Sequence, residues 1–323
     1  MTPERVEEIL TRFRTVRVLV VGDLMLDRYL TGHVDRISPE APVPVVRVNA
    51  ETTAVGGAGN VAANVAALGA GCDIVGCVGD DEDGRIVLEA LSQVGVGIDG
   101  ALTLTGRPTT VKTRVLARRQ QVVRVDREQD GDMDDGVAER LVRAIEGPGR
   151  DADVIVLEDY NKGVLVERVI GAALAGGPGR PSVVDPKRLR FFSFAGCTVF
   201  KPNAKELSDA LGEVLHPDDA AWMEATRQRL GCANLLLTLG EHGVALGMEE
   251  GDHLRIPAVG RSIYDVSGAG DTVTAVTAAC LGAGASVWEA AVLANHAAAI
   301  EVGKAGVATV SPEEILRQFR DSS

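Results

Sequence analysis

Asp265-Val266-Ser267-Gly268-Ala269-Gly270-Asp271-Thr272 is the stretch that says most about this chain. A run of Ala, Val and Thr follows it and predicts a buried helix that begins there. Gly268, Ala269 and Gly270 leave the backbone N–H groups at this helix start open to an anion, which the helix dipole also favours. Asp271 beside such a site suits a general base in phosphoryl transfer to a hydroxyl. The alternative is an acidic residue that only caps an ordinary helix.

Short apolar runs recur along the chain, and helix-like segments lie between most of them. The runs cover residues 18–23, 74–80, 154–159, 183–185, 199–203 and 235–240. Continuous apolar strands that alternate with helices predict an α/β fold, with a mostly parallel sheet covered by helices on both faces. Ligands of such sheets bind at the carboxyl ends of the strands. The residues that fall at these ends are Asp23, Asp159, Lys187, Asn203 and Gly240.

Two stretches break this alternation. Residues 31–48 contain three prolines, and residues 109–126 alternate apolar and polar side chains as half-exposed strands do. We expect both to form one small antiparallel β lid, at about 30–49 and 107–127, on a single domain that covers 1–323. The alternative is a pair of ordinary surface hairpins.

Composition excludes several classes of protein. The 323 residues carry a net charge of −13, which argues against nucleic acid or an anionic membrane as a partner. The five cysteines are scattered and form no C-x-x-C pair, as in a reduced cytoplasmic protein without a cysteine metal site. The charged amino terminus lacks an apolar signal core, and no apolar run reaches membrane-spanning length. We therefore expect a cytoplasmic protein.

Gly56-Gly57-Ala58-Gly59-Asn60 opens a second helix of small residues, over 61–68. Its glycines allow a polar ligand to approach the backbone, and Asn60 can both donate to and accept from sugar hydroxyls. A dinucleotide fingerprint is a competing interpretation, because Gly57, Gly59 and Ala62 fit G-x-G-x-x-A, with Asp80 beyond. That fingerprint should follow directly from a strand. We expect a loop over residues 49–55 instead.

These two glycine segments resemble the two signatures of the ribokinase-like (PfkB) sugar kinases, in the right order and over nearly the whole chain. Two further regions resemble the D-glycero-β-D-manno-heptose-7-phosphate kinases. They are Asp27-Arg28-Tyr29 with the RISPEAPVPVV string at 36–46, and Lys112-Thr113-Arg114 with residues 120–126. The resemblance implies ATP-dependent phosphorylation of this heptose phosphate at its anomeric hydroxyl. The 1,7-bisphosphate formed would feed ADP-heptose and lipopolysaccharide core synthesis.

The resemblance also implies roles for individual residues. Asp23, Asp27, Gly56, Gly57 and Asn60 would bind the sugar. The chain has no G-x-x-x-x-G-K-[ST], so ATP would be held by segments 201–206 and 238–243 and by an apolar helix near the C-terminus. The implied nucleotide set is Lys187, Asn203, Lys205, Glu206, Thr238, Gly240, Gly243, Asn295, Ala299 and Val302.

Metal ions are implied at two places. Asn203 and Glu206 would orient Mg²⁺ through its waters, since magnesium takes few protein ligands. Asp265 matches a position that binds a monovalent cation, K⁺, in many relatives. Simpler interpretations stay open: Glu206 as an exposed helix acid, and Ala299 and Val302 as core.

Basic residues gather around the expected lid. A sugar that already carries a phosphate needs cationic side chains to bind it, and the guanidinium of an arginine can bond two phosphate oxygens at once. We expect Arg119 and Arg124 only to pair with lid acids such as Asp126. The residues expected to bind the substrate from this side are Lys112, Arg114, Arg118, Asp159 and Lys162.

The expected ligands are therefore a phosphosugar, ATP, Mg²⁺ and a monovalent cation, with a second copy of the chain bound through the lid. No nucleotidyltransferase segment is recognisable within residues 1–323, so a separate protein would finish the pathway. One alternative is another small-sugar kinase, which a substrate panel would separate. The other is an inactive regulator that binds nucleotide or sugar, against which the intact Asp271 argues.

Overall fold

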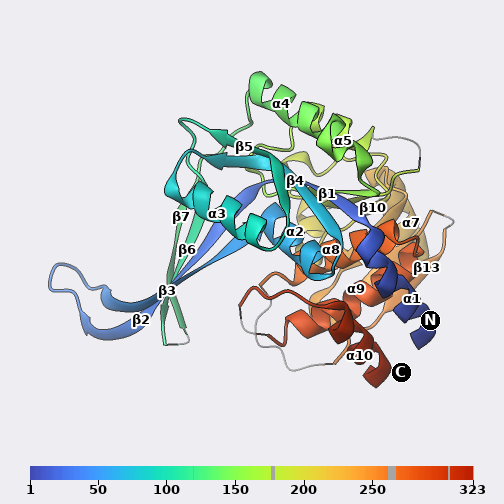
Figure 1. Ribbon diagram of the computed structural model, residues 1–323. Helices are drawn as coiled ribbons and strands as arrows, with labels where there is room; N and C mark the ends of the chain where they lie inside the picture. The colour runs from blue at the N-terminus through green and yellow to red at the C-terminus, as the bar shows by residue number, and fades with distance from the viewer. Residues whose placement is uncertain (119, 176–178, 250, 261–266, 305, 323) are drawn as a thin grey trace.

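A large β-sheet forms the centre of the molecule (Figure 1). The computed structural model describes residues 1–118, 120–175, 179–249, 251–260, 267–304 and 306–322. Within them the strand order is β13-β12-β11-β10-β9-β8-β1-β4-β5, parallel except for the antiparallel pairs that β12 makes. The strands are β1 (Arg17–Gly22), β4 (Gly71–Gly79), β5 (Gly97–Leu104), β8 (Val154–Glu158), β9 (Ser182–Asp185), β10 (Val199–Phe200), β11 (Asn234–Thr238), β12 (Val244–Gly247) and β13 (His253–Ile256).

Helices cover both faces of this sheet, as the apolar strands predict. In β1, Val18 and Val20 pack into one core, while Leu19 and Val21 pack into the other. The first core receives apolar side chains from α1 (Pro3–Arg12), α2 (Ala58–Ala67), α3 (Glu82–Gln93), α8 (Ala269–Gly282), α9 (Val287–Glu301) and α10 (Pro312–Ser322). The second receives them from α4 (Asp135–Glu146), α5 (Glu167–Leu174), α6 (Ala204–Leu211) and α7 (Ala220–Leu230). The α/β fold predicted from the sequence is confirmed.

The parallel strands deliver their carboxyl ends to one edge of the sheet. β1 and β8 run in register from Val18 and Val154 to Gly22 and Glu158, so that Asp23 and Asp159 follow side by side. β9 ends at Asp185 on the other side of β8, and Lys201 follows β10. Polar groups from segments far apart in the sequence therefore meet at this edge.

A separate four-stranded sheet, the lid, projects from one side of the molecule (Figure 1). Its strands are β2 (Leu24–Ile37), β3 (Pro44–Gly57), β6 (Thr110–Ala117) and β7 (Gln120–Arg127), in the order β3-β2-β6-β7. β2–β3 and β6–β7 are antiparallel hairpins, as expected, and the inner strands β2 and β6 pair in parallel. The hairpin is longer than the expected range 30–49, because β2 begins at Leu24 and β3 ends at Gly57.

The loop expected over residues 49–55 does not exist. These residues belong to β3, which continues to Gly57 and pairs with β2 as far as Leu24. Most of their side chains are exposed, so the segment lacks the apolar signal by which a strand is recognised. The glycine segment therefore does follow directly from a strand, and our argument from an intervening loop was wrong. However, β3 lies in the antiparallel lid hairpin and outside the parallel sheet that a dinucleotide fingerprint requires.

Two further features bear on the expectations from composition. Within the described part of the chain, no helix has both the length and the apolar character needed to span a bilayer. All five cysteines are buried and none is in a disulfide.

Candidate active site

The start of α8 brings Asp271 to the carboxyl edge of the large sheet. The helix begins at Ala269 after Gly268, whose φ of +95° favours glycine. A Cβ at Gly268 would lie 3.2 Å from Asn60 Nδ2, so a side chain there would press on the neighbouring amide. Asp271 lies in the first turn, and its carboxylate is almost completely buried.

Both carboxylate oxygens of Asp271 accept a hydrogen bond. Asn60 Nδ2, from α2, donates to Oδ2 at 2.6 Å, and the Tyr160 hydroxyl, from the turn after β8, donates to Oδ1 at 3.2 Å. Burial raises the pKa of Asp271 to about 6, although the Asn60 bond opposes this shift. The group is therefore mostly ionised at neutral pH and close to the pKa at which a general base is effective.

Two lysines balance the charge of the acidic groups beneath Asp271. Glu158, Asp185 and Asp271 each place a carboxylate oxygen within 4.8 Å of the others. Lys201 Nζ lies 2.7 Å from Asp185 and Lys187 Nζ 3.7 Å from it, and these cations hold the pKa of Asp185 below its ordinary value although burial opposes them. Burial, with the Asp185 and Asp271 charges, raises the pKa of Glu158 well above its ordinary value. Glu158 is therefore the group of this cluster most readily kept neutral.

Asp271 lies where two cavities meet. The first, which we call the lid pocket, has about 660 Å³ of unfilled space under the lid. The second, the α8–α9 cleft, has about 1410 Å³. Tyr160, Gly268 and Asp271 line both cavities, so a group bound in one could react with a group bound in the other at this point.

The lid pocket combines the buried acid with three cations. Five of the residues expected to bind the substrate line it: Asp27, Gly57, Asn60, Lys112 and Arg114. Arg114 forms an ion pair with Asp27 and stacks over the Tyr29 ring, 5.4 Å from its centroid. Arg124, which we expected only to pair with Asp126, makes that pair and also lines the pocket.

The other residues expected at the substrate lie outside the lid pocket. Arg118 has an exposed side chain in the turn between β6 and β7. Gly56 lies behind Asp27, whose Oδ2 would be 2.7 Å from a Cβ there. Asp159 is buried and accepts the N–H of Asn161, and Lys162 pairs with Glu128 and Asp130 on the side of the lid. Arg119 lies outside the described residues.

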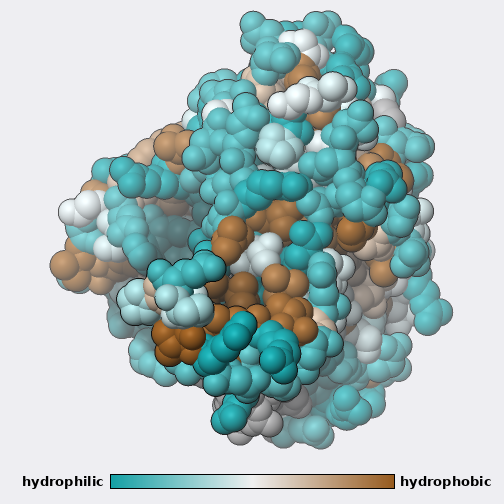
Figure 2. Space-filling view, turned by 90° about the vertical axis from the view of Figure 1, so that its left-hand side faces the viewer, coloured by the Kyte–Doolittle hydropathy of each residue, from teal (hydrophilic) through white to brown (hydrophobic). Residues whose placement is uncertain are grey.

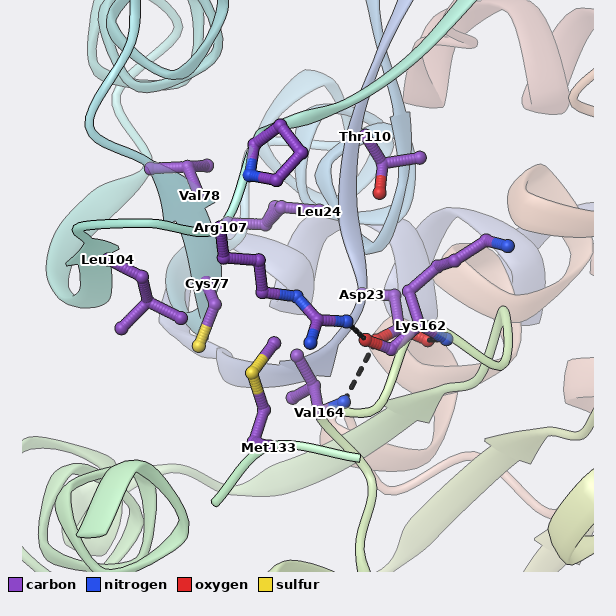
Figure 3. Close-up of a pocket in the computed structure, with 11 residues that line it drawn as sticks. Asp23, Leu24, Cys77, Val78, Leu104, Arg107, Thr110, Met133, Lys162 and Val164 are labelled. Atoms are coloured by element: carbon purple, nitrogen blue, oxygen red, sulfur yellow. Dashed lines mark hydrogen bonds between the residues drawn. The ribbon is translucent and has the colours of Figure 1, made fainter. Parts of the chain in front are cut away.

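Asp23 also faces away from the lid pocket and holds the turn that follows β8. Its carboxylate accepts the backbone N–H groups of Tyr160, Lys162 and Val164 at 2.8, 2.9 and 3.1 Å. Figure 3 shows this carboxylate at a small separate cavity, with the Arg107 side chain reaching toward it. The Arg107 guanidinium also donates to the carbonyl oxygen of Lys162 at 2.6 Å. In this structure Asp23 therefore stabilises the backbone of the turn after β8.

The α8–α9 cleft gathers the residues expected to bind nucleotide. Its lining includes Lys187, Asn203, Glu206, Thr238, Gly240, Gly243, Asn295, Ala299 and Val302. The first turn of α8 forms one wall, so its backbone N–H groups are available to phosphates. Lys205 is the exception, because its exposed ammonium pairs with Asp209 on the surface of α6.

Asn203 and Glu206 could hold a hydrated Mg²⁺ at the wall of this cleft. They form a capping box at the start of α6, in which each side chain accepts the backbone N–H of the other residue, and both residues line the cleft. Lys187 Nζ lies 2.5 Å from Glu206 Oε1. Oxygen donors of this kind suit magnesium bound through water, so the residues fit the ion. Asp265, expected at a monovalent cation, lies outside the described residues.

Sequence reasoning missed Tyr160 and the charge balance around Glu158, and it included Lys201 only as part of the segment 201–206. Lys201 and Glu158 do stand at strand ends, which is the signal that could have identified them. Tyr160 follows Asp159, but nothing local to it indicates a partner 111 residues away.

The chain matches the model of the pfkB family carbohydrate kinases over residues 16–314. The Bifunctional protein HldE of Pelobacter propionicus is 44% identical over 320 residues, which are 98% of this chain and 66% of that protein. The protein of that name from a Caulobacter species is 45% identical and covers 94% of this chain and 63% of its own length. This chain therefore spans slightly less than two-thirds of these relatives.

Solved structures share the fold at lower identity. Arabidopsis thaliana ribokinase, complexed with ribose and ATP, aligns with a TM-score of 0.74 at 22% identity, over 94% of this chain and 99% of that one. Phosphofructokinase-2 from Escherichia coli, in complex with potassium, aligns with a TM-score of 0.77 at 19% identity, over 95% and 99%.

Replacing Asp23 should destabilise the protein. Asp23→Asn keeps the size of the side chain but turns an amide donor toward backbone donors, so at least one of three charge-assisted bonds is lost. We expect a loss of about 2–3 kcal/mol in the free energy of unfolding, measured by denaturant titration. Asp159→Asn, which changes a buried acid that accepts from fewer backbone N–H groups, those of Asn161 and Lys187, is the control and should lose less. Equal losses would contradict the anchoring role.

Proposed function

We propose a substrate and a mechanism for this chain, which belongs to the pfkB family of carbohydrate kinases and is therefore an ATP-dependent carbohydrate kinase. The substrate we propose is D-glycero-β-D-manno-heptose 7-phosphate. The product is the 1,7-bisphosphate, formed at the anomeric hydroxyl on the route to ADP-heptose. Residues 1–323 would act as one kinase domain with its lid.

The observation that carries this proposal is the shared wall of the two cavities. ATP in the α8–α9 cleft and a sugar in the lid pocket would meet at Asp271 and Gly268, which line both. In-line transfer needs this arrangement, with the hydroxyl and the γ-phosphate on opposite sides of one reacting point.

In the proposed mechanism, Asp271 accepts the proton of the anomeric hydroxyl as the oxygen attacks the γ-phosphorus. The new P–O bond forms while the bond from the γ-phosphorus to the bridging oxygen of ADP breaks, and the proton leaves from Asp271 to solvent. The N–H groups at the start of α8 face the transferred phosphate, and preorganised donors of this kind stabilise developing charge. Mg²⁺ carried by the nucleotide, and oriented by Asn203 and Glu206, would neutralise phosphate charge.

The cations of the lid pocket favour a phosphorylated sugar. Lys112, Arg114 and Arg124 line this pocket in a chain whose net charge is −13. Each is paired with a lid acid or with Asp27, which orients it without using all its donors, because a guanidinium has five and the Lys112 ammonium has three. A phosphate could accept from the donors that remain, and a sugar without a phosphate would leave them without a charged partner.

Asp271→Asn should remove the base while keeping the shape of the site. General-base catalysis contributes about 10²–10⁴-fold, so we expect kcat to fall at least a hundredfold with little change in the Kd for ATP. Steady-state kinetics and calorimetric titration measure the two quantities. Asp218→Asn, on the exposed surface, should behave as wild type. A variant that keeps more than about a tenth of the wild-type kcat would exclude Asp271 as the base.

Arg114→Ala should impair use of the phosphorylated sugar selectively. Loss of a charge-assisted bond costs about 1.5–3 kcal/mol, so kcat/KM for heptose 7-phosphate should fall roughly 10–150-fold. Unphosphorylated heptose should lose much less. Arg118→Ala, on the same lid but outside the pocket, is the matched control.

The same coupled assay tests the substrate itself. Wild-type protein should prefer heptose 7-phosphate to fructose 6-phosphate and ribose. Preference for another sugar would support the alternative of a different small-sugar kinase. No turnover of any sugar, with intact ATP binding, would support an inactive regulator. Equal losses on both heptoses with Arg114→Ala would mean that Arg114 holds the lid or the ring.

We further propose that two copies pair through the lid. Strand β7 is exposed along its whole length, and apolar side chains stand exposed on the lid: Val34, Ile37, Val43, Val48, Val122, Val123 and Val125. Figure 2 views the side from which the lid projects, where apolar patches interrupt a mostly hydrophilic surface. Exposed strand edges and apolar patches of this kind favour association.

A charge on this surface should therefore dissociate the pair. Val123→Asp is expected to convert a dimer into a monomer in light scattering coupled to size-exclusion chromatography. Val214→Asp places the same charge at a more exposed valine after α6, away from the lid, and should leave the dimer intact. A wild-type protein that is monomeric at micromolar concentration would refute the proposal.

A further inference from the structure

Tyr160 stands between the two cavities and touches groups of both. It lies two residues after the end of β8, and it lines both the lid pocket and the α8–α9 cleft. No motif in the sequence identified it, and the mechanism above does not use it. Its two chemical parts, the hydroxyl and the ring, have different partners.

The hydroxyl faces Asp271. It donates to Oδ1 at 3.2 Å, while Asn60 donates to Oδ2 at 2.6 Å, so a donor from each side restrains the carboxylate. Burial raises the pKa of Tyr160 well above its ordinary value, and the Asp271 charge adds to this shift. The phenol therefore stays protonated and remains a donor throughout the range in which Asp271 titrates.

The ring faces Lys187. The ammonium of Lys187 lies 4.8 Å from the ring centroid, a cation–π distance, and also pairs with Glu206 and Asp185. Lys187 lines the α8–α9 cleft on the side of the proposed phosphates. The ring thus limits where this lysine can move.

The backbone that carries Tyr160 is fixed from below. Asp23 accepts the N–H of Tyr160 itself at 2.8 Å and those of Lys162 and Val164 beyond it. A buried carboxylate with three backbone donors is a stiff anchor, because any shift of the turn would leave a charged acceptor unpaired. The position of the phenol is therefore set by the fold of the turn.

We propose that Tyr160 is a positioning residue that holds the Asp271 carboxylate in the orientation for proton abstraction and, through its ring, keeps Lys187 in place beside the phosphates. This inference rests on the proposed role of Asp271 as the base. The hydroxyl acts on the base and the ring acts on the lysine, so the two effects can be separated by substitution.

The sign of the pH effect follows from the groups around Asp271. A donor to a carboxylate favours its ionised form, so that loss of the phenol should raise the pKa of Asp271 from about 6. The base works in its ionised form, and activity is lost as pH falls through that pKa. The acid limb should therefore move to higher pH. The charged or titratable groups that share this setting are Glu158, Asp185, Lys187 and Lys201 beneath the carboxylate, and Asp27, Lys112, Arg114 and Arg124 in the lid pocket.

The decisive variant is Tyr160→Phe, which removes the hydroxyl and keeps the ring. We expect the single-turnover rate of phosphoryl transfer to fall about tenfold and the acid limb of its pH profile to rise by about one unit, as loss of one hydrogen bond to a charged group predicts. The Kd for ATP should not change. Tyr160→Leu, which removes the ring as well, should in addition weaken ATP binding several-fold.

Other outcomes would overturn the inference. If Tyr160→Phe keeps the wild-type rate and profile, or loses rate with an unmoved profile, the phenol does not position the base. If Tyr160→Leu binds ATP as tightly as Tyr160→Phe, the ring does not hold Lys187 for the nucleotide. These failures leave the proposed function intact as long as Asp271→Asn is inactive. An active Asp271→Asn would instead exclude Asp271 as the base of the proposed mechanism, and this inference with it.

Discussion

The hydrogen bond from Asn60 Nδ2 to Asp271 Oδ2 joins two segments 211 residues apart in the sequence, and the site depends on it. It ties the start of α2, which follows the lid strand β3, to the start of α8. Both helices begin after a glycine with positive φ, Gly57 and Gly268, where the backbone turns tightly. The bond is buried and charge-assisted, so loss of either partner would leave a costly unpaired group. The lid, the lid pocket and the α8–α9 cleft therefore share one fixed point.

Charge balance is the second constraint on this edge of the sheet. An acidic chain concentrates Glu158, Asp185 and Asp271 at the point where polyanionic ligands are expected, which would repel them without compensation. Lys201 and Lys187 compensate this negative charge, because both ammonium groups pair with Asp185. Buried pairs of this kind add little net stability, since desolvation offsets their attraction. Their contribution is to set which carboxylates are charged.

The sequence predicted the features whose signals are local. The apolar runs predicted β1, β4, β8, β9, β10 and β11 but not β5, β12 and β13, and the octet ending at Thr272 predicted the start of α8. Tyr160 could not be predicted in the same way, because its partners Asp271 and Asp23 come from distant strands and helices. The extent of β3 was missed because its exposed residues carry no apolar pattern. Arg118 carries a guanidinium on the lid, but it lies in the turn between β6 and β7 with a φ of 58° and does not line the pocket.

The lid hairpin can also be considered as a mechanical element. β2 and β3 are each 14 residues long, which corresponds to about 45 Å of strand at about 3.3 Å per residue. The base of this arm is the pair Leu24–Gly57, next to the buried carboxylates, and its tip is in solvent. A rotation of about 6° at the base would move the tip by about 5 Å over such a length. The register shifts at Thr31/Gly32 and Val34/Arg36 bend the two strands partway along the arm. A displacement of the tip is therefore transmitted to the base through a bent hairpin and not through a straight one.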